Sequence, residues 1–228
     1  MLFNSVSFAI FFPVVVVFYF VLPQRARWVW LLVSSYYFYM SWNPKYALLL
    51  AAVTVTTFIS GLLIAKSGAI RDEKKRALQR KLWVAFSFVS TLSILFFYKY
   101  FWFAFKNIDL VMSKAGVQLA PPAFDVILPV GISFYTFQAL SYAMDVYRGE
   151  IGVERNLPRY ALFVAFFPLL VAGPIERSKN LLVQVHEEHF FDYNNMKNGL
   201  LLMLWGYFQK IVIADNVAII VNGVYNDY

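Results

Sequence analysis

The sequence lacks cysteine altogether and is poor in charged residues, which make up 14% of its 228 residues. Without cysteine the chain forms no disulfide, no thiolate metal site and no cysteine nucleophile. Hydrophobic residues account for 61% of the chain and aromatic residues for 20%, which is too apolar for an ordinary soluble domain. The composition therefore predicts an integral membrane protein that has the lipid bilayer as a partner.

The net charge of +7 comes from segments between apolar runs. Such a distribution orients membrane proteins and does not indicate nucleic-acid binding. Segment 66–81 carries seven Lys or Arg residues against Asp72 and Glu73, and we expect it to be a basic cytoplasmic loop. Arg25 and Arg27 then lie on the same side, which places the N-terminus outside.

Apolar segments divide the chain into membrane spans. A bilayer core about 30 Å thick needs roughly 20 apolar residues per helix, and six to seven segments reach or approach this length. One of them is short and contains Pro168, which indicates a re-entrant or broken helix. The predicted fold class is all-α, a polytopic membrane helix bundle that forms a single domain over residues 1–228. The expected segments are Val6–Leu22, Trp28–Trp42, Tyr46–Ala65, Leu82–Phe105, Val126–Val146, Tyr160–Ala172 and Leu200–Val221.

A stripe of polar residues runs along the segment that ends at Val146. Gln138, Ser141, Asp145 and Arg148 recur at spacings of three, four and three, which places them within about 80° of one another on a helix. Polar groups at membrane depth face a bundle interior or a water-filled cavity rather than lipid. Two interpretations are equally weighted here: bonding between helices with an Asp145–Arg148 ion pair, or the wall of a substrate tunnel.

Two further clusters interrupt apolar runs. In FFPLLVAGPIER, Pro174 and Arg177 follow a helix break, which is either a plain helix end or part of a functional site. In WGYFQKIVIADN, Lys210 and Asp215 are about 140° apart on an ideal α-helix, so we expect each to have a different partner unless Lys210 reaches the interface.

The two histidines, His186 and His189, lie in the polar segment QVHEEHFF. Their spacing of three differs from the spacing of four in zinc metalloproteases, so we expect solvated loop side chains and no metal site. No phosphate-binding loop or nucleophile motif is present in the sequence.

Three runs taken together resemble one family. The runs PVGISFYTFQALSYAMDVYRG, FFPLLVAGPIER and WGYFQKIVIADN are similar in order and spacing to the membrane-bound O-acyltransferase superfamily, in the bacterial branch of alginate O-acetylation. The opening MLFNSVSFAIFFPVVVVFYFVLP and the later SSYYFYMSWNP are also similar to that branch, so the resemblance covers essentially the whole chain.

The resemblance implies a helix bundle with a central tunnel and no bound cofactor. It implies transfer of an acyl group, commonly acetyl, from a cytoplasmic donor such as acetyl-CoA to hydroxyls of an extracytoplasmic polysaccharide or to an acyl-accepting partner protein. The location implied is the bacterial cytoplasmic membrane. The residues taken as candidates for lining a substrate tunnel are Gln138, Ser141, Asp145, Arg148, Pro174, Arg177, Lys210 and Asp215.

The resemblance also implies that the chain is the N-terminal portion of a larger domain. The family's catalytic histidine lies in an apolar helix of the second half, and neither His186 nor His189 has such surroundings, so no catalytic residue is assigned and the portion alone is expected to be inactive. Two alternatives remain from the residues themselves. The stripe can line a transporter or channel path, or the chain can be a non-catalytic membrane scaffold.

Overall fold

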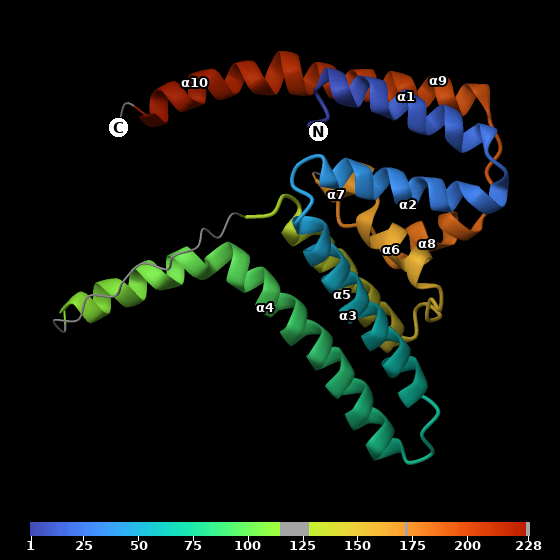
Figure 1. The fold of residues 1–228 in the computed structure, drawn as a ribbon, viewed down its shortest axis with the longest axis vertical. Helices are drawn as coiled ribbons and strands as arrows, with labels where there is room; N and C mark the ends of the chain where they lie inside the picture. Colours follow the sequence, from blue (N-terminus) through green and yellow to red (C-terminus); the bar gives the residue numbers. More distant parts are fainter. Residues whose placement is uncertain (115–127, 172, 227–228) are drawn as a thin grey trace. The chain divides into compact units, whose positions relative to one another are not determined.

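The computed structural model describes residues 1–114, 128–171 and 173–226, and these are helical with no strand among them (Figure 1). The all-α fold class is confirmed. The helices are α1 (Val6–Val21), α2 (Gln24–Met40), α3 (Tyr46–Ser67), α4 (Glu73–Lys114), α5 (Ile132–Arg148), α6 (Leu157–Ala165), α7 (Phe167–Leu170), α8 (Ser178–His186), α9 (Tyr193–Phe208), the π-helix η1 (Gln209–Ala214) and α10 (Asp215–Asn226).

Three helical stretches in the described part are long and apolar enough to cross a membrane. They are α3, α4 and the continuous run α9–η1–α10, and α1 is a shorter apolar helix. α4 has 42 residues, far more than the roughly 20 that a bilayer core requires. The chain is a multi-pass membrane protein, as its composition predicts.

The described residues form two compact units. One contains Leu22–Glu187 with Met1, and the other contains Leu2–Val21 with Glu188–Tyr228. In the second unit, the Tyr207 hydroxyl of α9 donates to the carbonyl of Phe3 at 2.6 Å. The two units are described separately below.

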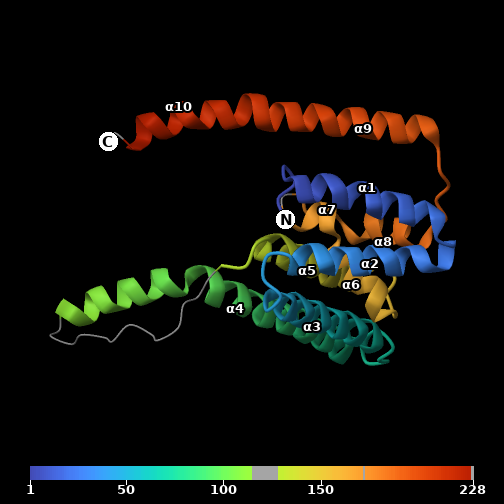
Figure 2. The ribbon, with the colours of Figure 1, turned by 45° about the horizontal axis from the view of Figure 1, so that its top comes forward.

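In the first unit, α5 is the central helix and packs against α3, α4, α6, α7 and α8. Figures 1 and 2 both show α3 and α4 side by side along it. Gly61 of α3 allows a close approach to α5, because a Cβ there would lie 2.7 Å from Cε1 of Tyr142. Tyr142 in turn packs on Tyr160 of α6, with ring centroids 4.5 Å apart. This aromatic core fixes the face that α5 presents to each neighbour.

The basic segment 66–81 is mostly helical, which differs from the loop predicted for it. α3 continues to Ser67 and α4 begins at Glu73, so only a short connection lies between them. Asp72 accepts hydrogen bonds from the N–H groups of Lys74 and Lys75 at 3.0 and 3.2 Å and so caps α4. The residues that follow are mainly Lys, Arg, Ala, Leu and Gln, which are good helix formers, so the helix extends into the polar segment.

α5 begins later than predicted. The expected start at Val126 lies outside the described residues, and the helix starts at Ile132, after Gly131 with φ of 73°. The carbonyl of Leu170 occupies the position that a Cβ on Gly131 would take, so glycine is needed here for both its conformation and its size. The late start leaves α5 with 17 residues, and the polar stripe runs from near its middle to its last residue.

The predicted broken helix is confirmed. The predicted segment Tyr160–Ala172, whose last residue lies outside the described part, is observed as α6 and α7, which are separated at Phe166. Phe166 has φ and ψ of −57° and 109°, which is not helical, and Pro168 lies in the first turn of α7, where proline is tolerated. The polar connection expected to follow contains a further helix, α8, that the sequence analysis missed.

Candidate functional site

The two most buried residues of the polar stripe, Gln138 and Asp145, face protein. Gln138 and Asp145 are 3% and 4% exposed, so both are turned away from lipid as expected. The Nε2 group of Gln138 donates to the carbonyl of Phe163 on α6 at 2.6 Å. Ser141 is half-buried and its hydroxyl returns to the carbonyl of Gln138 on its own helix at 2.8 Å. Gln138 therefore joins α5 to the broken helix. The role of the stripe as a tunnel wall stays a prediction.

Gln138 and Ser35 complete the hydrogen bonding at the break between α6 and α7. In a continuous α-helix the N–H of Phe167 would donate to the carbonyl of Phe163, four residues earlier. Instead, Gln138 donates to that carbonyl, and the N–H of Phe167 donates to Oγ of Ser35 on α2 at 3.2 Å. An interrupted helix in a membrane requires such replacements.

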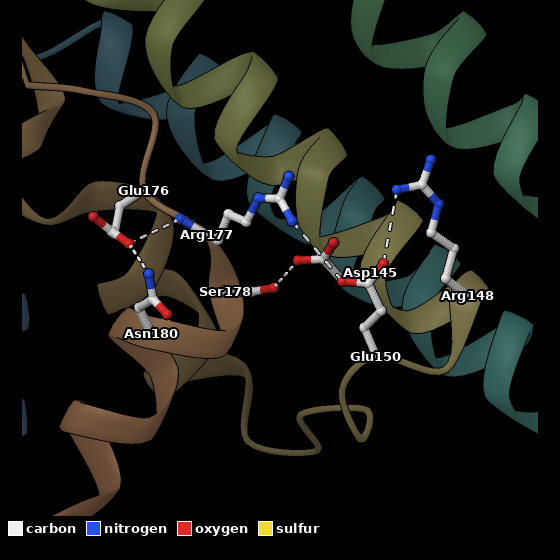
Figure 3. Close-up of polar contacts among 7 residues, drawn as sticks. All are labelled: Asp145, Arg148, Glu150, Glu176, Arg177, Ser178 and Asn180. Atoms are coloured by element: carbon white, nitrogen blue, oxygen red, sulfur yellow. Dashed lines mark hydrogen bonds and ion pairs between the residues drawn. The ribbon is translucent and has the colours of Figure 1, made fainter.

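Asp145 pairs with a residue that the sequence did not indicate. The Ser178 hydroxyl at the start of α8 donates to Oδ2 of Asp145 at 2.6 Å, and Ser178 is fully buried (Figure 3). The ion pair between Asp145 and Arg148 that we considered is not formed, because Arg148 turns to Glu150 with 3.7 Å between Nη1 and Oε1. Asp145 thus holds α8 against α5.

Glu150 connects the two motifs that carry arginine. Its carboxylate lies 3.7 Å from Nη1 of Arg148 and 4.0 Å from Nη1 of Arg177, on either side of it (Figure 3). Both arginine side chains are 57% exposed, whereas that of Glu150 is 35% exposed. We call Arg148, Glu150 and Arg177 the arginine rim. The two guanidinium groups exceed the single carboxylate by one positive charge.

Short local contacts position the connection that carries Arg177. Pro174 is exposed in the segment between α7 and α8. Glu176 accepts from the backbone N–H of Arg177 at 3.2 Å and from the Asn180 side chain at 2.6 Å (Figure 3). Asp145, Arg148 and Arg177 are therefore brought to one end of α5, as neighbours of Ser178 and Glu150.

Lys210 and Asp215 lie in the second unit, and the expectation that they have separate partners is wrong. Nζ of Lys210 bonds to Oδ1 of Asp215. The reason is η1, because a π-helix closes hydrogen bonds between residues five apart and brings residues i and i+5 to the same face. The 140° separation applies only to an ideal α-helix.

His186 lies in a helix and not in the loop predicted for it, although its side chain is 43% exposed, as a solvated side chain would be. It ends α8, and its Nε2 lies 3.2 Å from Oε2 of Glu154, whose side chain is 11% exposed. Its other ring nitrogen contacts the carbonyl of Leu182 at 2.8 Å. Among the described residues there is no group of three or more His, Asp or Glu side chains arranged to hold a metal ion.

Known proteins with related sequences match nearly the whole chain. The chain is 37% identical over 216 residues to Probable alginate O-acetylase AlgI of Pseudomonas aeruginosa, a match of 94% of this chain and 40% of the relative. It is 36% identical over 216 residues to the protein of the same name from Azotobacter vinelandii, covering 94% of the chain and 42% of that relative. It is 32% identical over 250 residues to the Peptidoglycan O-acetyltransferase of Helicobacter pylori, covering 96% and 45%. No protein-family model and no solved structure matches the chain.

The helical fold and its long apolar helices define a polytopic membrane protein. Similarity to the alginate O-acetylases over nearly the whole chain confirms the resemblance, seen in its motifs, to that branch of the membrane-bound O-acyltransferase superfamily. It spans about two fifths of the length of the curated relatives that it matches. Partial coverage of this extent fits the N-terminal portion that the motifs indicate.

Proposed function

We propose that the chain forms part of a membrane O-acetyltransferase that acetylates hydroxyl groups of a polysaccharide outside the cytoplasmic membrane. The observation that carries the proposal is similarity over nearly the whole chain to proteins named for the O-acetylation of alginate and of peptidoglycan. Both of those polymers present sugar hydroxyls. An acyl-accepting partner protein is a second form of acceptor compatible with the same chemistry.

The proposed orientation places the C-terminal end of α5 in the cytoplasm and the N-terminus outside. It is supported by the excess of Lys and Arg in segment 66–81, since such segments stay cytoplasmic. Arg80, in the first turns of α4, donates to the carbonyl of Tyr147 and lies over its ring at 5.1 Å. The basic start of α4 and the end of α5 therefore lie on the same side of the membrane.

The arginine rim is proposed to bind the acyl donor, which we take to be acetyl-CoA. Guanidinium groups bind phosphate oxygens through paired N–H donors, and the donor carries several phosphates. Arg148 and Arg177 are exposed enough to be reached and are held at a common carboxylate. Glu150 keeps both guanidinium groups oriented at one carboxylate.

The chemistry proposed is direct acyl transfer from a thioester. The oxygen of the acceptor hydroxyl attacks the acetyl carbonyl carbon, the carbon–sulfur bond breaks, and the hydroxyl proton passes through a general base to the thiolate that leaves. Residues of this chain orient the donor and hold the helices around it. We assign the general base to a part of the relatives' length that this chain does not cover, as the resemblance implies for the family's catalytic histidine.

The proposal is tested in membrane vesicles that contain the protein at the full length of its relatives. Vesicles are given acetyl-CoA labelled in the acetyl group, and label released from polymer by mild alkali is measured as ester. We expect ester formation that is absent from vesicles without the protein. Uptake of labelled solute without ester formation would contradict the proposal and favour the transporter alternative.

A further inference from the structure

The run α9–η1–α10 is largely apolar, and the described residues of its own unit leave it uncovered. No residue of α9 or η1 is buried among the described residues, although the run is long and apolar enough to cross a membrane. In α9 only Met196, Met203 and Tyr207 are partly covered, and Tyr207 donates to the carbonyl of Phe3. Helices that are hydrophobic all round are covered by lipid or by protein. Composition alone does not distinguish these two surroundings.

An ion pair in the middle of this run does distinguish them. Lys210 and Asp215 bond to each other, and their side chains remain 59% and 44% exposed. In the predicted span Leu200–Val221, Lys210 is ten residues from the start, close to mid-depth. Ionisable groups at that depth are costly in lipid and almost always face other protein or a water-filled cavity. This face therefore needs protein or water against it.

The unsatisfied hydrogen-bond donors of Lys210 and acceptors of Asp215 define which chemical group can pack against the pair. Lys has three N–H donors and a carboxylate has about four acceptor positions, so one mutual bond leaves both groups unsatisfied. The pair is neutral overall, and a further charge against it would be buried without compensation. An uncharged group that both donates and accepts, an amide or a hydroxyl, satisfies both residues.

The shape of the same face suits a helix. Gly206, Lys210, Ala214 and Ala218 follow one another at intervals of four, and a Cβ on Gly206 would meet no atom within 4 Å. Small residues around a polar group allow the backbones of two membrane helices to approach closely. Asn216 donates to the carbonyl of Val212 at 2.8 Å and so satisfies a backbone group of the π turn.

We propose that the Lys210–Asp215 face is the docking site for a further transmembrane helix of the same polypeptide, which brings an amide or hydroxyl side chain to mid-membrane depth. The occupant is assigned to the same polypeptide because 55–60% of the length of the relatives lies outside the match. Such an additional length is sufficient for several spans at about 20 residues each. The proposal rests on similarity to these longer relatives and not on the acceptor or the donor of the reaction.

The test uses photocrosslinking in the full-length protein in native membranes. A benzophenone amino acid replaces Ala214, beside the ion pair. As the control it replaces Ile213, which lies between Lys210 and Asp215 in the sequence but away from the side of the helix that carries them. A third probe replaces Ala218, one turn further along the proposed face, in case bulk at Ala214 disturbs packing. Size-exclusion chromatography selects variants that remain monodisperse, and mass spectrometry of the digested protein identifies the crosslinked peptides.

We expect the probes at Ala214 and Ala218 to crosslink within one polypeptide to an apolar peptide that contains Asn, Gln, Ser, Thr or Tyr and lies outside residues 1–228. The probe at Ile213 should give at least tenfold less of that product. Crosslinks to residues 22–187, to a second copy at twice the mass, or only to lipid would each overturn the proposal. None of these readouts depends on acetyl transfer, so failure here leaves the proposed function untouched.

Discussion

The side chain of Gln138 donates to the carbonyl of Phe163 at 2.6 Å, which is the carbonyl that the N–H of Phe167 would bond in an unbroken helix. The freed N–H of Phe167 goes to Ser35. Two side chains from α5 and α2 therefore maintain a break that Pro168 favours. This gives Gln138 a defined structural role in addition to the tunnel role predicted for it.

Gln138→Leu is expected to destabilise the protein because it leaves the carbonyl of Phe163 buried without a donor. The expected cost is about 1–3 kcal/mol in the free energy of unfolding. Ser141→Ala is the matched control on the same stripe, because its hydroxyl bonds only to its own helix, and it should cost about 0.5 kcal/mol. Unfolding in detergent measures both, and equal losses would contradict the role given to Gln138.

Ser178→Ala is expected to loosen α8 from α5. It removes the hydrogen bond to the buried carboxylate of Asp145, and hydrogen bonds to charged groups contribute about 1.5–3 kcal/mol. Lys179→Ala, at the next and exposed position, should be nearly neutral. Asp145→Asn keeps an acceptor for Ser178 and should cost less than Asp145→Leu. If Ser178→Ala and Lys179→Ala have the same melting temperature, the contact does not hold the helix.

Gly131→Ala and Gly149→Ala form a matched pair that separates strain from a steric clash. Both residues have positive φ, 73° and 76°, so alanine at either position costs about 1–3 kcal/mol in backbone strain. A Cβ on Gly149 meets nothing within 4 Å, whereas one on Gly131 meets the carbonyl of Leu170. We therefore expect Gly131→Ala to be the more destabilising by about 1–3 kcal/mol. Equal thermal shifts would show that the approach of α7 to α5 is not tight.

Hydrophobic patterning predicted most of the fold because each span must satisfy its own backbone within lipid. The same reasoning anticipated the break near Pro168, since proline removes an N–H that only another group can replace. Hydrophobic patterning did not predict the ends of helices that continue beyond the apolar segment. α4 starts nine residues before the predicted Leu82 because Asp72 caps a run of good helix formers.

The candidate site was only half predictable for two physical reasons. The spacing on α5 placed Gln138 and Asp145 on one buried face, but their partners Phe163 and Ser178 are 25 and 33 residues away, and no local pattern encodes them. For Lys210 the local pattern itself was misleading. The angle of 100° per residue assumes an α-helix, and the π turn changes which residues share a face.

The most direct test of the account concerns the donor and the arginine rim. Arg148→Gln and Arg177→Gln remove one phosphate-binding group each, and Lys179→Gln removes a neighbouring exposed charge as the control. The measurement is the KM for acetyl-CoA in the vesicle transfer assay with the full-length protein. We predict a rise of about tenfold for each arginine variant, equivalent to about 1.4 kcal/mol, with kcat little changed. A KM in both arginine variants equal to that of Lys179→Gln would contradict the account.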